Sequence, residues 1–355
     1  MRLGAIKIVG TGLIGTSLGL ALARHGIKAG LSDHSKANLR LAIEYGAGEE
    51  ASEEPELVIV CVPPDTTAEV VAEQLAKHPK AVVTDTASVK TEIHSRVAEL
   101  AGNDASRYIG SHPMAGREKG GPGSARADLF FARPWVITPT ENSSAEAIDF
   151  LKDLALKIGS LPILMSASEH DRAVALVSHL PQLVASLLAA RLLEGQESEL
   201  NLTGQGLRDT ARIAASDPNL WMQILSQNAA AITPLISKLR EDLELIETSF
   251  HNLSEAGALA RINSLLERGN AGIARIPGKH GGKFVNYQQL TIVIDDSPGA
   301  LASLLTFIGE IGVNIEDLKL EHSPGAPIGL VEIQIDPASA QQLAKQLTDN
   351  GWRIV

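Results

Sequence analysis

Short β-branched runs alternate with segments of helical periodicity over the first 165 residues of the chain. The runs lie at residues 5–9, 27–32, 57–62, 81–84, 108–110, 135–138 and 161–164. Strands that alternate with helices in this way are typical of a parallel sheet covered by helices on both faces. The pattern therefore predicts a doubly wound α/β domain over residues 1–165.

The strand signal then disappears, and Ala, Leu, Arg and Glu recur at helical spacing over residues 173–193 and 229–266. This periodicity predicts an all-helical domain over residues 166–282. Pro181 falls inside the first helix, where it removes a backbone hydrogen bond and is expected to kink the chain beside His179. The helices carry more apolar surface than one chain easily covers, so we expect two copies to pair as a homodimer.

A third pattern follows a loop that the breakers at residues 276–282 predict. Its segments alternate as strand, helix, strand, strand, helix and strand at residues 289–294, 299–309, 314–321, 328–335, 338–348 and 352–355. This order is typical of a ferredoxin-like βαββαβ module. We place the module at residues 286–355.

Charge and cysteine content narrow the class of protein. The net charge of −11 leaves no basic stripe for nucleic acid. The only cysteine, Cys61, has no internal partner for a disulfide, which suits a reducing cytoplasm. An N-terminal secretory signal is rejected because Lys7 and several glycines interrupt its apolar region. No later run is expected to reach the roughly 20 apolar residues that span a bilayer, so we expect a soluble cytoplasmic protein without a membrane partner.

Residues 10–15 read Gly-Thr-Gly-Leu-Ile-Gly, between a predicted strand and a predicted helix. Gly10 permits a tight turn, Gly12 lets backbone amides approach a pyrophosphate, and Gly15 lets the helix pack closely on the strand. With the helix N-terminus facing the phosphates, this context predicts a Rossmann-like dinucleotide site.

Asp33 ends the second strand about twenty residues downstream, where its carboxylate is placed to accept from ribose hydroxyls. A carboxylate there repels a 2′-phosphate and favours NAD over NADP, although His34 and Lys36 follow it and would tolerate a phosphate. Residues 61–64 end another strand beside the same cleft, so their backbone is expected to contact the cofactor. The predicted cofactor residues are Gly10, Gly12, Leu13, Ile14, Gly15, Asp33, Val62 and Pro63.

Further motifs read Ser-His-Pro-Met-Ala-Gly at residues 111–116, Ser-His-Leu-Pro at 178–181 and Asp-Thr-Ala-Arg at 209–212. In this order they resemble the active-site motifs of prephenate dehydrogenases, oxidoreductases of tyrosine biosynthesis. The resemblance implies NAD-dependent oxidative decarboxylation of prephenate to 4-hydroxyphenylpyruvate. Aromatisation drives that reaction, so no metal is required, and no cluster of metal-ligand residues with convincing spacing is evident.

His112 is the candidate base, in the loop expected after the strand at residues 108–110. A neutral imidazole there accepts a hydrogen bond from the ring hydroxyl and polarises it as hydride leaves. The resemblance gives His112 the same role, against the alternative of a structural loop histidine. It also implies that the Ser88 hydroxyl contacts the substrate hydroxyl and the nicotinamide ribose, while capping a helix near Val89 is an equal alternative. Lys90 is either solvated or serves a phosphate, and we leave it unassigned.

Arg212 is the candidate for the ring carboxylate, which a guanidinium binds with two parallel hydrogen bonds. Asp209 shares its helical face and either orients it or forms a surface pair. Arg208 and Arg117 are rival carboxylate binders. The resemblance selects Arg212 and implies that Glu118 pairs with it while the site is empty.

The resemblance also places His179 in the substrate pocket, against the alternative of a buried helix histidine. The family commonly has a second histidine three residues later, where this chain has Gln182. Because a glutamine oxygen accepts from an ammonium group, arogenate, the amino-acid relative of prephenate, is an alternative substrate. Another NAD(P)-linked dehydrogenase of the β-hydroxyacid type and a non-catalytic amino-acid sensor are more distant alternatives.

Residues 296–301 and 312–315, Asp-Ser-Pro-Gly-Ala-Leu and Gly-Val-Asn-Ile, resemble an ACT domain, a small amino-acid-sensing module. The helix start at Pro298 and Gly299 suits an amino-acid carboxylate, and L-tyrosine, the pathway product, is the expected effector. An architectural dimerisation module is the alternative, and Lys279 and His280 in the linker either couple the domains or are incidental. The predicted effector residues are Asp296, Gly299, Asn314 and Ile315.

Overall fold

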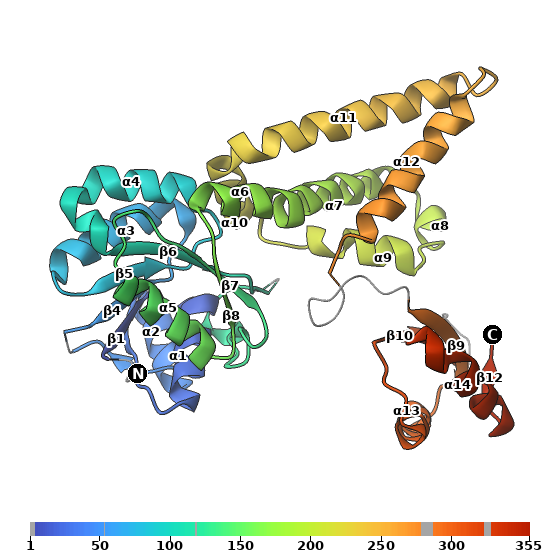
Figure 1. Ribbon diagram of the computed structural model, residues 1–355, viewed down its shortest axis with the longest axis horizontal. Coiled ribbons are helices and arrows are strands. Elements are labelled where there is room, and N and C mark those ends of the chain that lie inside the picture. Colours follow the sequence, from blue (N-terminus) through green and yellow to red (C-terminus); the bar gives the residue numbers. More distant parts are fainter. Residues whose placement is uncertain (1–3, 53, 118, 278–286, 323–327) are drawn as a thin grey trace. The chain divides into compact units, whose positions relative to one another are not determined.

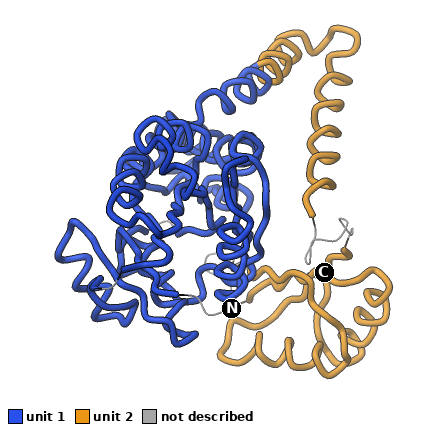
Figure 2. Tube along the Cα trace, turned by 60° about the vertical axis from the view of Figure 1, so that its left-hand side comes forward, with its two compact units in different colours: residues 1–240 blue, residues 241–355 orange. Residues whose placement is uncertain are grey.

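The computed structural model describes residues 4–52, 54–117, 119–277, 287–322 and 328–355 (Figure 1). Its contacts separate into two units, Met1–Arg240 and Glu241–Val355 (Figure 2). The division falls within one long helix, α11 (Ala229–His251), rather than at a loop. Each unit is therefore described by itself.

The first unit is built on an eight-stranded sheet in the order β3-β2-β1-β4-β5-β6-β7-β8. Neighbouring strands are parallel except for β6 and β7, which are antiparallel, so the prediction of a wholly parallel sheet is wrong at this one pair. A parallel return needs a long crossover, usually a helix, whereas β6 and β7 are joined by loops and one short 3₁₀ turn. The strands are β1 (Ile6–Val9), β2 (Gly30–Ser32), β3 (Glu49–Glu50), β4 (Leu57–Val60), β5 (Val82–Asp85), β6 (Tyr108–Pro113), β7 (Pro134–Thr138) and β8 (Leu161–Leu164).

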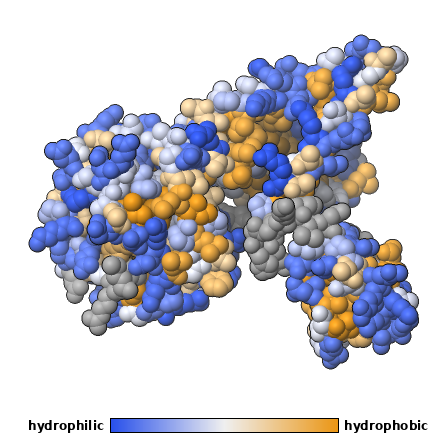
Figure 3. All heavy atoms as spheres, in the orientation of Figure 1, coloured by the Kyte–Doolittle hydropathy of each residue, from blue (hydrophilic) through white to orange (hydrophobic). Residues whose placement is uncertain are grey.

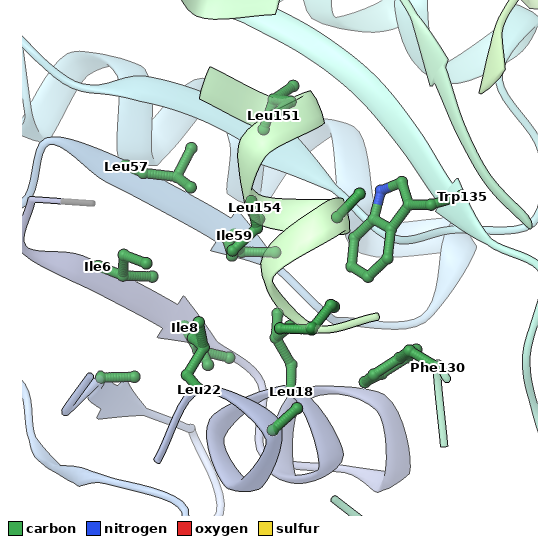
Figure 4. Close-up of a cluster of buried hydrophobic side chains, with 14 of the residues drawn as sticks. Ile6, Ile8, Leu18, Leu22, Leu57, Ile59, Phe130, Trp135, Leu151 and Leu154 are labelled. Atoms are coloured by element: carbon green, nitrogen blue, oxygen red, sulfur yellow. The ribbon is translucent and has the colours of Figure 1, made fainter. Parts of the chain in front are cut away.

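Two hydrophobic cores lie on opposite faces of this sheet, as a doubly wound fold requires. Strand β4 is buried at every position: Leu57 and Ile59 belong to one core and Val58 and Val60 to the other. The first core includes the large side chain of Trp135, shown with its neighbours in Figure 4. The helices that contribute to these cores are α1 (Leu13–Arg24), α2 (Lys36–Glu44), α3 (Pro64–Lys77), α4 (Thr91–Ala101), α5 (Ala145–Lys157) and, from the helical region, α10 (Pro218–Gln227).

Strand β6 is longer than the sequence indicates, and this changes the setting of His112. Its pairing with β7 continues the strand through Pro113, with His112 opposite Val136. His112 therefore lies within a strand, and the expectation that it lies in a loop is wrong. It still falls at the carboxyl end of β6.

The helical region begins with α6 (Ala167–Val174), which Ser166 and Glu169 cap reciprocally. A π-helical turn, Ala175–His179, joins it to α7 (Leu180–Arg191). Pro181 has no N–H to donate, and the predicted kink takes the form of this π-helical turn just before it. The remaining helices are α8 (Glu197–Leu200), α9 (Gln205–Ala211), α10 (Pro218–Gln227), α11 and α12 (Ala258–Ile273).

One expectation about these helices is wrong. Residues 229–266, where helical spacing was expected, divide between α11 and α12, with a break between His251 and Ala258 next to Gly257, whose φ of +89° is left-handed. The helical run Ala167–Glu194 contains an 18-residue window of mean hydropathy 1.7, so by length and composition alone it is long enough to cross a membrane. Polar residues at positions 178, 179 and 182 interrupt its apolar residues, so the sequence pattern does not mark it as one continuous apolar run.

The second unit contains a four-stranded antiparallel sheet in the order β10-β11-β9-β12. Alternate residues of β11, from Gly329 to Ile335, are buried. Val331, Ile333 and Ile335 of this strand form one core with buried leucines of helices α13 and α14. The elements follow in the order β9 (Gln288–Asp295), α13 (Ala300–Ile311), β10 (Asp317–His322), β11 (Ile328–Ile335), α14 (Pro337–Asp349) and β12 (Arg353–Ile354).

Candidate active site

The carboxyl ends of four adjacent parallel strands, β1, β4, β5 and β6, bring most of the predicted site residues to one edge of the sheet. The glycine turn follows β1, Val62 and Pro63 follow β4, Ser88 follows β5, and His112 ends β6. Three strand spacings separate β1 from β6, which is about 14 Å. An extended dinucleotide at the turn is long enough to reach the strand of His112.

The glycine turn is shaped by close backbone approach. Gly10 has a φ of +95°, and a Cβ there would lie 2.5 Å from the Cys61 carbonyl oxygen. A Cβ on Gly15 would lie 1.9 Å from the Gly10 oxygen, whereas Gly12 has open space around it. Helix α1 begins after Gly12 without a side-chain cap. The turn therefore offers uncapped amides and a cradle without a Cβ, which fits a pyrophosphate.

Asp33 anchors this turn. Its Oδ2 accepts from Thr11 N at 2.6 Å and from Thr11 Oγ1 at 2.8 Å, and its Oδ1 accepts from Ser35 N at 2.7 Å. The carboxylate is almost wholly buried by these contacts. Asp33 therefore holds the end of β2 against the glycine turn, and its contact with a ribose stays a prediction.

His112 is connected to two side chains that the sequence analysis did not select. Its Nδ1 lies 2.8 Å from His170 Nε2, and His170 Nδ1 lies 2.8 Å from Asp171 Oδ1. A carboxylate only accepts, so His170 carries its proton on Nδ1 and, when neutral, accepts at Nε2 from His112. This leaves the lone pair of His112 on Nε2. Burial, and the charge that His170 carries when protonated, hold the pKa of His112 well below 6.5.

Asp171 also caps helix α4. Its Oδ1 accepts from Lys90 N at 2.9 Å and its Oδ2 from Thr91 N at 2.7 Å. Burial acts to raise the pKa of Asp171, but hydrogen bonds from His170 and Thr91 outweigh it and hold the pKa at about 2. Because α4 begins at Thr91 and its cap comes from Asp171, Ser88 does not cap it. The alternative of Ser88 as a helix cap is therefore wrong.

Asn228 fixes the second site histidine. Its Nδ2 donates to the Asp171 carbonyl oxygen at 2.8 Å and lies 3.0 Å from His179 Nδ1. Because the carbonyl only accepts, this atom is the amide nitrogen, and His179 Nδ1 accepts from it. The proton of His179 is then on Nε2. Burial lowers the pKa of His179 to about 4, so the ring is a neutral donor.

Lys90 and Asp85 form a fully buried ion pair beside these groups. Tyr108 donates its hydroxyl to Asp85 Oδ1 at 2.8 Å, and Ala87 donates its N–H to Asp85 Oδ2 at 2.9 Å. Neither role considered for Lys90, a solvated side chain or a phosphate ligand, fits this burial. The pair instead fixes the loop after β5 that carries Ser88.

The other predicted substrate residues lie on the helical region. Gln182, 6% exposed, follows His179 by one turn in α7, and its Nε2 donates to Ser186 Oγ at 3.4 Å. Arg212 is exposed and begins the short 3₁₀ turn η5 (Arg212–Ala214), which contacts α7. Asp209, expected to pair with Arg212, accepts from Gln205 at 2.8 Å.

The remaining residues predicted for this site and for the linker are exposed or lie outside the described part of the chain. Arg117, a rival carboxylate binder, donates to the Ser124 carbonyl oxygen at 3.1 Å, while Arg208 is exposed in α9. Glu118, Lys279 and His280 lie outside the described residues. The roles expected for Arg212 and Glu118 therefore stay predictions.

Sequence reasoning missed His170, Asp171 and Asn228, all of them at least 96% buried. Adjacent His and Asp at the start of the helical region were the available signal, because neither is expected on the buried side of a helix without a partner. Asn228 gave no signal, since its role depends on the packing of α10 against the sheet domain. A glycine turn suited to a dinucleotide and a neutral, oriented histidine at the same edge of the sheet are typical of a dinucleotide-dependent oxidoreductase.

Comparison with known proteins identifies the family. The model of the prephenate dehydrogenase nucleotide-binding domain matches residues 18–163, and that of the prephenate dehydrogenase dimerisation domain matches residues 166–262. The chain is 34% identical to the probable prephenate dehydrogenase NovF of Streptomyces niveus over 97% of its own length and 98% of the relative's. The chain therefore belongs to the prephenate dehydrogenase family.

The solved structures that resemble the chain include two with named substrates. Prephenate dehydrogenase from A. aeolicus, in complex with hydroxyphenyl propionate and NAD+, is 25% identical with a TM-score of 0.66, covering 76% of this chain and 99% of its own. Synechocystis arogenate dehydrogenase is 28% identical with a TM-score of 0.63, covering 76% of this chain and 98% of its own. The solved structures that the chain resembles thus include proteins named for either substrate.

Gly15→Ala and Gly12→Ala separate the two uses of glycine in the turn. The Gly15 methyl would overlap the Gly10 oxygen, so we expect the free energy of unfolding to fall by about 1–3 kcal/mol. The Gly12 methyl meets nothing in the protein, so Gly12→Ala should keep its stability and lose NAD affinity. Urea unfolding and NAD titration measure both. Unchanged stability in Gly15→Ala, or unchanged affinity in Gly12→Ala, would contradict this account of the turn.

Proposed function

We propose that the chain catalyses the NAD-dependent oxidative decarboxylation of prephenate to 4-hydroxyphenylpyruvate. The observation that carries this proposal is the orientation of His112. Its Nδ1 is engaged by His170, so a basic Nε2 remains at the sheet edge that also holds the glycine turn. The relatives named prephenate dehydrogenase support the choice of substrate.

The reaction asks three things of the protein. NAD accepts the hydride that leaves the hydroxyl-bearing ring carbon. His112 Nε2 accepts the hydrogen bond of that hydroxyl and takes up positive charge as the carbon is oxidised. His179 donates from Nε2 to a substrate oxygen, and Arg212 binds the ring carboxylate. Ser88, held beside the buried Lys90–Asp85 pair, contacts the substrate hydroxyl and the ribose.

Arogenate is the second candidate substrate, and Gln182 favours it. The side chain is buried one turn after His179, and its amide nitrogen is engaged by Ser186. Its oxygen is the acceptor that remains, and an acceptor suits the ammonium group of arogenate rather than the keto group of prephenate. The structural relative named arogenate dehydrogenase supports the same reading.

Reduction of NAD by each substrate tests the activity, and His112→Asn tests the base. We expect NADH to form with prephenate, arogenate or both, and turnover to fall by roughly 10²- to 10⁴-fold in His112→Asn because a general base is lost. The affinity for NAD should stay the same. An unmodified protein inactive with both substrates, or an active His112→Asn variant, would overturn the assignment.

Arg212→Ala tests the carboxylate site, with Arg208→Ala, on helix α9 just before η5, as the matched control. Losing a bidentate partner should raise the Michaelis constant for the substrate with little effect on NAD affinity. Arg208→Ala should behave as the unmodified protein. If instead Arg208→Ala raises the Michaelis constant and Arg212→Ala does not, Arg208 holds the carboxylate.

We also propose that the βαββαβ module of the second unit is an ACT domain that binds L-tyrosine as a feedback effector. Its strand order and element order suit this class. Gly299 has a φ of +91° at the start of α13, and Asn314 donates to Glu316 Oε1 at 2.6 Å just before β10. Asp296 and Ile315 flank these two positions along the chain.

Tyrosine inhibition of the whole chain measures the effector role. We expect tyrosine to lower turnover, and Asn314→Ala to weaken that inhibition while uninhibited turnover is unchanged. Asn350→Ala, at the C-terminal end of α14 in the same module, is the control and should be inhibited normally. Turnover that tyrosine leaves unaltered would contradict the proposal.

A homodimer is the assembly that we propose for the helical region. The matched family domain is a dimerisation domain. Leu187 on α7 and Met222 on α10 are each 64% exposed, and Figure 3 shows apolar side chains gathered over the helices. Apolar surface of this kind is normally covered by a partner. A stable monomer in light scattering of the whole chain would contradict this assembly.

A further inference from the structure

Three side chains from two elements form a line that ends at the candidate base. His112 comes from β6, and His170 and Asp171 come from α6. Both contacts between them are 2.8 Å, and His170 is fully buried. His170 faces His112 with Nε2 and Asp171 with Nδ1, and His112 uses only Nδ1 in this line, so a proton can pass between the two rings without either ring turning.

Orientation alone does not require this arrangement. A backbone carbonyl that accepts from Nδ1 is enough to fix the tautomer of a histidine. The partner of His112 is instead a second imidazole, which is itself able to bind a proton and contacts a carboxylate. Asp171 is kept ionised by two backbone N–H groups, from Lys90 and Thr91. Positive charge on His170 would therefore touch a fixed negative charge, which charge on His112 would not.

We propose that His170 transiently stores the proton that His112 takes from the substrate hydroxyl, with Asp171 as its counter-ion. This rests on the proposed function. As hydride leaves for NAD, the hydroxyl proton passes to His112 Nε2 and the His112 Nδ1 proton passes to His170 Nε2. The bond to the departing carboxylate breaks and its electron pair enters the ring, giving a phenolate. Both protons then return, so the phenol forms and no net proton is released.

The surrounding charges make His112 the poorer place for the positive charge. Its pKa is held low by burial and by neighbouring cations. Two of these neighbours contact a carboxylate directly, Lys90 with Asp85 and His170 with Asp171, whereas the contact of His112 among the described residues is with His170. The titratable groups facing the two rings are Lys90 before α4, His94 on α4, Asp85 on β5, and His179 on the π-helical turn.

His170→Gln separates proton storage from orientation. The glutamine oxygen can accept from His112 Nδ1 and keep its tautomer, but it does not bind a proton at neutral pH. We expect turnover to fall on the order of 10²-fold, within the range for a lost acid–base step, with NAD affinity unchanged. His78→Gln is the matched control, because His78 is also buried and contacts a carboxylate, Glu54, at 3.0 Å outside the site. It should leave turnover unchanged.

Asp171→Asn tests the proposal through the pH dependence of kcat/KM, which would not shift if Asp171 had only a structural role. Protonation of His112 in the free enzyme removes the base, so kcat/KM falls towards acid pH. The Asp171 charge acts to raise the pKa of His112, so its removal is expected to lower that pKa further. The acid limb of kcat/KM should therefore move to lower pH while the plateau of kcat falls. NAD titration shows whether the variant has kept its fold.

The outcomes distinguish this proposal from the proposed function. An unmodified protein that oxidises neither prephenate nor arogenate overturns the proposed function. An active protein whose His170→Gln variant keeps full turnover, or whose acid limb stays fixed in a folded Asp171→Asn variant, overturns proton storage. Nitrogen-15 NMR of the unmodified protein needs no turnover: protonated Nδ1 on His112 supports the line, and protonated Nε2 with bare Nδ1 overturns it.

Discussion

The carboxylate of Asp171 is the contact on which the site depends. It caps α4 through Lys90 and Thr91, and it orients His170, which orients His112. Its own carbonyl oxygen receives the amide of Asn228. One residue at the start of the helical region thus fastens that region to the sheet domain and sets the histidine that ends β6. The same carboxylate therefore fixes both the geometry of the site and the packing of α6 against α4.

Such a centre is stable only because its polar groups are satisfied together. A buried charge without a partner costs several kcal/mol, and removing one member of a buried pair typically costs about 3–5 kcal/mol. The buried charge of Asp85 is compensated by the ammonium of Lys90, the hydroxyl of Tyr108 and a backbone N–H. The buried charge of Asp171 is compensated by two backbone N–H groups and an imidazole. The site is therefore rigid, because moving any one of these groups would leave another buried polar group without its hydrogen-bond partner.

The sequence predicted what local patterns control. The alternation of strands and helices located the sheet, and the glycine turn and His112 were found because motifs mark them. The sequence pattern did not predict features that depend on strand pairing. Strand β7 pairs antiparallel with β6, and this pairing extends β6 so that it includes His112. Asn228 and Asp171 lie 57 positions apart and meet only through packing. Lys90 gave the same signal as a surface lysine, because its partner five residues earlier is recognisable only once both are known to be buried.

The two site histidines are held in opposite tautomers by different chemistry. A carboxylate, acting through His170, leaves His112 an acceptor at Nε2, whereas an amide leaves His179 a donor at Nε2. The two rings therefore suit different groups of a substrate. His112 accepts from a hydroxyl group, and His179 donates to an oxygen that accepts. Because burial lowers the pKa of both rings, neither brings a positive charge to the resting site near neutral pH. A carboxylate substrate of the kind that we propose then needs a cation from elsewhere, which supports the role that we propose for Arg212.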